Sequence, residues 1–191
     1  TQMIAKGLDF PGVRLVGVVS ADTALQLPDF RASERTFQLV SQVAGRAGRT
    51  ADGPQARVIV QSMHPDNPAV LHAAAHEWDR FAEHELAMRA GAGLPPAKRM
   101  ARIVFRDRDL DTAMAMANAA AQALSNTNEE IELLGPAPCP MARIDDRHRI
   151  GLEVLADTPG TLGRALAKAR VAGGLKPGEK VIIDVDPTTL L

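Results

Sequence analysis

Cysteine is almost absent from this sequence, which has one, Cys139, among its 191 residues. A single cysteine excludes an internal disulfide bond and a zinc site built from several cysteines, and it suits a reducing compartment. Long apolar runs are also absent, and none reaches the length of a membrane-spanning helix. The first residues show no secretory signal, so the sequence predicts a cytoplasmic protein without a membrane partner.

The sequence also lacks a strong net charge. Its 22 basic and 23 acidic side chains leave a formal charge of −1 at pH 7. Any surface that binds nucleic acid therefore has to be local rather than a property of the whole chain. A hydrophobic content of 46% and a charged content of 24% are ordinary for a globular protein, and the length allows two small domains or one large domain.

The first third of the sequence has the pattern strand, helix, strand. Residues 13–22 form an apolar, β-branched run that is typical of a strand buried on both faces of a parallel sheet. A helix is expected from Ser33 toward Arg49, with Phe37 on its apolar stripe, and a second buried strand over residues 56–62. This order indicates part of a doubly wound α/β sheet that is too small to be a domain by itself.

One long helix is expected to follow, from Pro68 to about Ala90. Asn67 is a good N-cap residue, and proline is favoured at the first helical position. The segment GAGLPPAK, residues 91–98, ends the helix and marks a domain boundary. The packed side of the helix is expected to carry Leu71, Ala74, Trp78 and Phe81.

The rest of the chain alternates evenly between strands and helices. Strands are expected at 99–105, 131–135, 149–155 and 180–185, and helices at 110–125 and 159–171. This βαββαβ order is that of the ferredoxin-like split unit. The sequence therefore predicts three parts, namely a partial α/β lobe at 1–64, a connecting helix and linker at 65–95, and a ferredoxin-like α+β domain at 96–191.

The segment SQVAGRAGR, residues 41–49, is unusual because glycine disfavours a helix interior by roughly 1 kcal/mol relative to alanine. Gln42, Arg46 and Arg49 are spaced to project from one face of the helix. Arginine forks match phosphate oxygens, and the two glycines allow a close approach to the backbone. Taken alone, the segment is either a phosphate clamp presented across an interface or a solvated helix end with a glycine cap.

A family resemblance favours the phosphate clamp. TQMIAKGLDFP, residues 1–11, and QVAGRAGR, residues 42–49, resemble motifs V and VI of superfamily 2 helicases. The run from GLDFPGVRLVGVVSAD through QVAGRAGR, together with GLPPAKRMARI and the terminal DVDP, is similar to the replication-restart helicase family PriA, also called primosomal protein N′. The similarity spans nearly the whole chain, which is therefore identified as a C-terminal fragment of a PriA-type protein.

The resemblance implies roles for individual residues. Arg46 and Arg49 match the catalytic arginines that reach the ATP γ-phosphate from the second RecA-like lobe, and Gln42 matches the polar residue that opens the same motif. Gly7 and Asp9 match positions that link the DNA contact to the nucleotide site. The positions of motif V near the DNA backbone are matched by Thr1, Gln2 and Lys6.

The resemblance also implies an activity and its partners. A whole protein of this kind is expected to be an ATP-dependent 3′-to-5′ DNA helicase that recognises stalled or abandoned forks and starts primosome assembly. ATP and Mg²⁺ are then held mainly by a first lobe, and zinc by a cysteine-rich module, both outside these residues, so the 191 residues alone are expected to be inactive. The implied partners are forked and single-stranded DNA, single-stranded DNA-binding protein and other primosome proteins at the nucleoid.

Two alternatives to this function stay open. One is another superfamily 2 DNA translocase, which the βαββαβ part and the DVDP ending disfavour. The other is a non-enzymatic fork-binding primosome module with a degenerate ATPase, which the presence of Gln42, Arg46 and Arg49 disfavours.

The last domain is expected to bind DNA through local positive charge. It has Phe105 but no tyrosine or tryptophan, so a platform of stacked aromatic side chains is not expected. No metal site is expected either, because HEWDR, residues 76–80, lacks the second histidine of the zinc-protease motif. The candidate phosphate contacts are Lys98, Arg99, Arg147 and Arg149.

Overall fold

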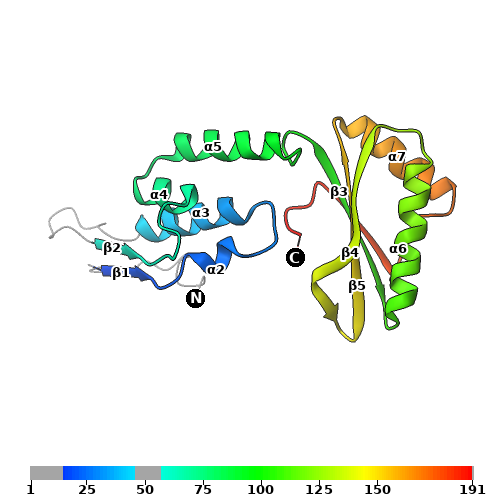
Figure 1. Ribbon diagram of the computed structural model, residues 1–191, viewed down its shortest axis with the longest axis horizontal. Helices are drawn as coiled ribbons and strands as arrows, with labels where there is room; N and C mark the ends of the chain where they lie inside the picture. The colour runs from blue at the N-terminus through cyan, green and yellow to red at the C-terminus, as the bar shows by residue number, and fades with distance from the viewer. Residues whose placement is uncertain (1–14, 46–56, 191) are drawn as a thin grey trace. The chain divides into compact units, whose positions relative to one another are not determined.

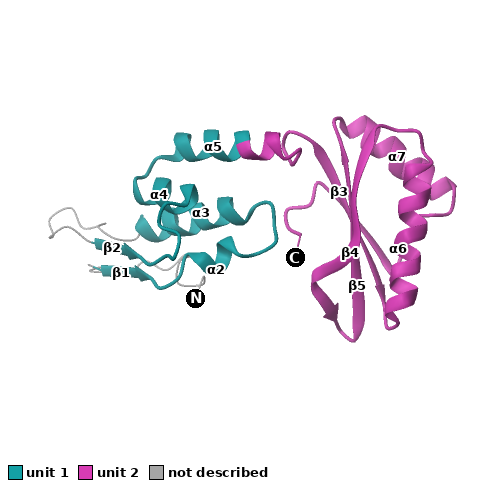
Figure 2. Ribbon diagram, viewed as in Figure 1, with its two compact units in different colours: residues 1–87 teal, residues 88–191 magenta. Residues whose placement is uncertain are grey.

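The computed structural model describes residues 15–45 and 57–190, and the chain divides into two compact units, residues 1–87 and 88–191 (Figure 2). The division falls inside the connecting region 65–95 that the sequence suggests. Each unit has its own layers of secondary structure and its own cluster of buried side chains (Figure 1).

The sheet of unit 1 is a parallel pair, β1 (Leu15–Val18) and β2 (Arg57–Val60), with Leu15 opposite Arg57. The strand–helix–strand order of the sequence is confirmed, but the expectation that both strands are buried on both faces is wrong. Val18 and Val60 pack against the unit 1 core, whereas Leu15 and Ile59 are 61% and 58% exposed. Side chains alternate between faces along a strand, and the described helices of unit 1 cover only one of them.

Helices α2 (Asp22–Leu25) and α3 (Ala32–Ala44) lie between these two strands in the chain. The strand expected over residues 13–22 ends earlier, at Val18, because α2 already begins at Asp22. Residues 13 and 14 lie outside the described residues. The apolar stripe predicted for α3 is Phe37, Val40, Ala44 and Ala47. Phe37 and Val40 are confirmed as buried, at 4% and 1% exposure, whereas Ala44 is half-buried and Ala47 lies outside the described residues.

The expected long helix after Pro68 is instead two helices, α4 (Pro68–Ala74) and α5 (Trp78–Gly91). Asn67 caps α4 as predicted, its side chain accepting a hydrogen bond from the Ala69 amide at 2.9 Å. His76 then adopts a left-handed φ of 58°, and the amide of Glu77 donates to the carbonyl of His72 at 2.9 Å. These contacts form a Schellman motif, which usually has glycine at the left-handed position, so the sequence did not signal it.

The packed side of these helices also differs from the prediction. Of the predicted set, Phe81 is 2% exposed, but Leu71, Ala74 and Trp78 are exposed. α4 instead buries Ala69, Val70 and Ala73, and the buried residue of α5 is Phe81. The rings of Phe37 and Phe81 stack with centroids 4.2 Å apart, and they join the unit 1 core of Ala21, Phe37, Val40, Ala69, Val70, Ala73 and Phe81.

Unit 2 has the expected βαββαβ order. Its elements are β3 (Arg99–Asp107), α6 (Leu110–Ser125), β4 (Ile131–Ile144), β5 (Arg147–Ala156), α7 (Pro159–Val171) and β6 (Val181–Val185). The antiparallel sheet has the strand order β4-β5-β3-β6, which is the arrangement of the split βαββαβ unit. The predicted α+β organisation of this part is confirmed.

The core of unit 2 lies between one face of this sheet and the two helices, which cover the same side (Figure 1). β3 contributes Ala101, Ile103 and Phe105, all at 1% exposure or less. α6 presents mostly alanines to the core, which lets the helix approach the sheet closely. Both helices begin at side-chain caps, where Asp109 and Thr158 accept hydrogen bonds from the amides of Thr112 and Thr161.

Candidate nucleic-acid interface

Most of the residues that the helicase resemblance singles out lie outside the described residues. Their proposed roles at the nucleotide and at DNA therefore stay predictions. These residues are Thr1, Gln2, Lys6, Gly7, Asp9, Arg46 and Arg49.

Gln42, the remaining member of the predicted catalytic set, lies on α3 and is exposed. Gly45 follows the helix with φ −67° and ψ −9°, which is right-handed helical backbone. A glycine that caps a helix through its conformational freedom is instead left-handed. At Gly45, therefore, backbone geometry does not require glycine, which counts against the interpretation of this residue as a glycine cap.

Asp22 joins the carboxyl ends of the two parallel strands of unit 1. It follows β1, is 6% exposed, and accepts hydrogen bonds at 2.9 Å from the Ser62 hydroxyl and the Met63 amide, which follow β2. The Met63 amide is the main reason that the pKa of Asp22 is lowered below its ordinary value. Asp22 thus links the segments that follow the two strands, at the edge where ligands of open α/β sheets generally bind. The sequence does not reveal this contact, because the partners of Asp22 lie about forty residues away.

The four candidate DNA contacts of unit 2 all have partners within the unit. Lys98 lies 3.1 Å from Glu132, Arg99 pairs with Asp186, and Arg147 pairs with Glu179. Arg149 donates to the backbone carbonyl of Met141 at 3.2 Å. Arg149 therefore differs from the other three, because its partner is neutral and the guanidinium charge is not compensated there.

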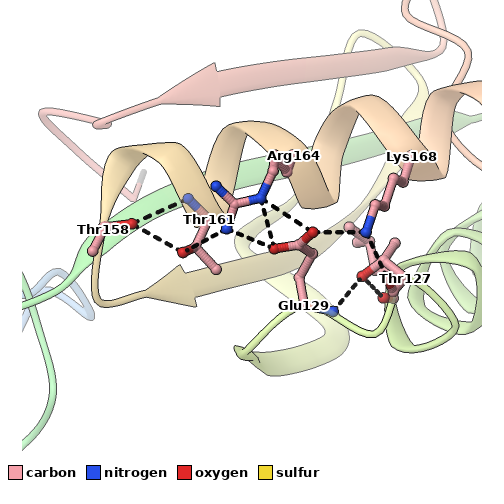
Figure 3. A network of polar contacts seen from close by, with 7 residues as sticks. Thr127, Glu129, Thr158, Thr161, Arg164 and Lys168 are labelled. Atoms are coloured by element: carbon pink, nitrogen blue, oxygen red, sulfur yellow. Dashed lines mark hydrogen bonds and ion pairs between the residues drawn. The ribbon is translucent and has the colours of Figure 1, made fainter.

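A larger polar network, which the sequence also does not reveal, surrounds Glu129 (Figure 3). The Glu129 carboxylate, whose side chain is 9% exposed, accepts hydrogen bonds from Arg164 at 3.0 Å and from Lys168 at 2.7 Å. Lys168 also donates to the carbonyl of Thr127 at 3.1 Å. The Arg164 guanidinium and the Lys168 ammonium hold the pKa of Glu129 below its ordinary value. The network fastens α7 to the segment between α6 and β4, and it neutralises two cations of α7.

Arg102 is a buried cation in the middle of β3, with a side chain that is 5% exposed. Its Nε lies 3.8 Å from Glu153 on the neighbouring strand, and neither its Nε nor its Nη1 has a hydrogen-bond partner among the described residues. Burial raises the pKa of Glu153, and the charge of Arg102 opposes that shift. The pair lies on the sheet face opposite the helices, because its strand neighbours Ala101 and Ile103 point into the core.

In the described ranges, 15–45 and 57–190, no three histidine, cysteine, aspartate or glutamate side chains are placed to share a metal ion. Among the same residues, no helix is both long enough and apolar enough to span a bilayer.

Comparison with known proteins identifies the family. Residues 90–188 match the family described as the primosomal protein N C-terminal domain. The chain is 40% identical to the replication restart protein PriA of Treponema pallidum over 194 aligned positions, which cover 100% of the chain and 29% of that protein. It is 38% identical to PriA of Haemophilus influenzae, over 100% of the chain and 26% of that protein.

A third relative, PriA of Bacillus subtilis, is 43% identical over 150 residues, which are 78% of the chain and 18% of that protein. The chain thus spans less than a third of the length of these relatives. The resemblance to a C-terminal fragment of such a protein is confirmed. The chain belongs to the PriA family of replication restart proteins and contains that family's C-terminal domain.

Proposed function

We propose that the chain is part of an ATP-dependent 3′-to-5′ DNA helicase that acts at stalled forks and starts primosome assembly. The observation that carries this proposal is the extent of the similarity. The alignment with the Treponema pallidum protein covers 100% of the chain, so it includes residues 1–64 with both motif-like segments. Similarity limited to residues 90–188 would support only the C-terminal domain.

In this proposal, unit 1 contains the remainder of a second RecA-like lobe. The parallel pairing of β1 and β2, with α3 between them in the chain, supports it, because RecA-like lobes are built from such units. Gln42 is exposed near the end of α3, on the helix that leads directly into Arg46 and Arg49. The arginines would stabilise charge on the transferred γ-phosphoryl group, as arginine fingers do in other phosphoryl-transfer enzymes.

The proposal assigns the remaining parts of the ATP site to a first lobe outside these residues. ATP and Mg²⁺ are held mainly there, and zinc belongs to a separate cysteine-rich module. Unit 2 is proposed to bind forked and single-stranded DNA and to contact single-stranded DNA-binding protein and other primosome proteins.

The test is an arginine replacement in a PriA-type protein that contains both lobes. Arg46→Ala and Arg49→Ala should each lower DNA-stimulated ATP hydrolysis by roughly 10³-fold or more, while DNA affinity changes little. Arg57→Ala, an exposed arginine on β2, is the matched control and should leave hydrolysis unchanged.

Unchanged hydrolysis in both finger variants would overturn the arginine assignment. Absence of hydrolysis in the wild-type protein would instead favour the fork-binding module with a degenerate ATPase. The 191-residue chain alone should hydrolyse no ATP, because the groups that hold the β-phosphate and Mg²⁺ lie elsewhere.

A further inference from the structure

One end of the unit 2 sheet forms a pocket of about 410 Å³, which we call the arginine pocket. Its cations come from two neighbouring strands, Arg106 and Arg108 from the end of β3 and the residue after it, and Arg147 and Arg149 from the start of β5. Pockets of roughly 300–1,000 Å³ are the usual size for small-ligand sites.

The register of the sheet places two of these cations directly opposite each other. Arg106 pairs with Arg149 in the antiparallel ladder between β3 and β5. Like charges in opposite positions destabilise a sheet. Arg106 donates to the backbone carbonyl of Glu179 at 2.7 Å and also interacts electrostatically with the Glu179 carboxylate. Within the described residues, Arg149 donates only to the backbone carbonyl of Met141, at 3.2 Å. An anion between the two guanidinium groups would remove this repulsion.

The pocket also retains unused hydrogen-bond donors. The Nε of Arg106 is buried and has no partner in the described part of the chain. Arg108 is exposed, and no ion pair or hydrogen bond of its side chain is found among the described residues. The four guanidinium groups face two carboxylates, those of Asp145 and Glu179, so the lining has two positive charges in excess.

The rest of the wall is apolar. Ile144, at the end of β4, and Ile182, on β6, line the pocket and are 40% and 42% exposed. A lining of arginines beside exposed isoleucines suits a ligand in which a phosphate is joined to an apolar ring. A nucleotide within a strand has this composition, whereas an aspartate- or glutamate-rich peptide offers carboxylates without the ring.

We propose that the arginine pocket binds one nucleotide of a single-stranded nucleic acid. The guanidinium groups hold its phosphate, and the base or sugar lies against the two isoleucines. Planar guanidinium forks are well matched to phosphate oxygens. This inference rests on the proposed function, in which unit 2 contacts DNA, and it adds Arg106 and Arg108 to the contacts expected from the sequence.

The test uses the 191-residue chain and a fluorescein-labelled single-stranded 12-mer in an anisotropy titration. Arg108→Ala and Arg149→Gln should each weaken binding by about fivefold or more. Each should also reduce the slope of log K against log salt by at most about 0.7, the amount that one phosphate of a single strand contributes, because the arginines share that phosphate. Arg108→Ala removes a side chain without a folded-state partner in the described residues, so the fold should be unaffected.

Arg170→Ala is the matched control, because Arg170 is an exposed arginine of unit 2 on α7, outside the pocket. It should change the affinity by less than about twofold, as expected for a loss of general charge at a distance. Glu179→Gln should act in the opposite direction and tighten binding by about twofold, because it releases Arg147 from its ion pair.

Three outcomes would overturn the assignment of the arginine pocket as a nucleotide site. The first is equal loss in Arg108→Ala and Arg170→Ala, which would show a response to net charge alone. The second is that Arg108→Ala weakens the binding of inorganic phosphate or of a decaglutamate peptide but leaves the binding of the 12-mer unchanged. The third is 12-mer binding that all pocket variants leave unchanged. A wild-type chain that binds neither single-stranded nor forked DNA would remove the proposed DNA role of unit 2, and the pocket with it.

Discussion

Ile103 and Ile59 are the same side chain on strands of the two units, yet the first is 0% and the second 58% exposed. Ile103 lies on β3, which has a hydrogen-bonded strand on each side and two helices over its core face. Ile59 lies on β2, whose sheet has two described strands and whose outer face no described residue covers. An apolar residue on a strand is thus buried only where other elements pack on its face.

The comparison has an energetic consequence. The unit 2 core contains 17 buried residues and the unit 1 core 7, both counted among the described residues. Buried apolar area is the main favourable term in folding. Unit 2 should therefore be the more stable unit, and unit 1 should depend on a few aromatic contacts. The following substitutions test this difference, from the largest expected effect to the smallest.

Phe37→Ala should cause the largest loss, about 3–5 kcal/mol in unfolding free energy, and should unfold unit 1 first. Phe37 stacks on Phe81 and lies 5.4 Å from Trp78, measured between ring centroids. Trp78 is the only tryptophan in the chain, so its fluorescence reports on unit 1 during heating. The circular dichroism of unit 2 should persist at that temperature. Loss of both signals at one temperature would contradict the expectation that unit 1 unfolds first.

Ile103→Ala and Ile59→Ala compare the two strands directly. Ile103→Ala should lower the unfolding free energy by about 2–5 kcal/mol, because it leaves a cavity in a closed core. Ile59→Ala should cost less than about 1 kcal/mol, because the side chain is already largely in water. Denaturant titration followed by circular dichroism measures both. Equal losses would mean that β2 is packed as tightly as β3.

Gly174→Ala and Gly17→Ala test close packing at one glycine in each unit. A Cβ on Gly174 would lie 2.2 Å from the Cβ of Ala123, so the segment after α7 or helix α6 has to move. This should destabilise unit 2 by about 1–3 kcal/mol. A Cβ on Gly17 meets no described atom within 4 Å. Gly17→Ala should therefore be neutral or stabilise by about 0.5 kcal/mol, because it restricts the unfolded chain. Thermal unfolding of both variants is the measurement, and similar shifts would contradict the comparison.

Glu129→Gln should lower the melting midpoint of unit 2 at pH 7 by less than Gly174→Ala does, because the carboxylate pairs with two cations that are largely exposed. Because the folded pKa of Glu129 is lowered, its contribution is fully present above the ordinary value of 4.5 and is lost as the pH falls through the folded pKa. The difference between variant and wild type should therefore shrink below about pH 4. A difference that grows on acidification would mean that the network does not favour the ionised carboxylate.

Much of unit 2 was predictable because its signals are local. The expected bounds of α6 and α7 agree with the structure, since Asp109 and Thr158 are N-cap residues directly before each helix. β4 is longer than expected, running to Ile144 rather than Gly135. Prolines at 136, 138 and 140 argue against a strand, but they are tolerated here because β4 lies at the edge of the sheet.

The features that the sequence did not reveal depend on residues that are distant in the chain. Glu129 is fastened by Arg164 and Lys168, which are 35 and 39 positions away. The break between α4 and α5 has a histidine at a position where glycine is the usual signal. In the arginine pocket, Arg147 and Arg149 were expected to contact DNA from their local charge. Arg106 and Arg108 were not, because only strand register brings them together.

The amino-acid order by itself determined the family, the βαββαβ succession and the two capped helices of unit 2, because motifs, periodicity and caps act over a few residues. The tertiary structure alone decided which strand faces are covered and which charges meet. The opposition of Arg106 and Arg149 follows from an antiparallel register between β3 and β5. Such a register is set by the packing of the whole sheet and its helices, which no short segment of the chain contains.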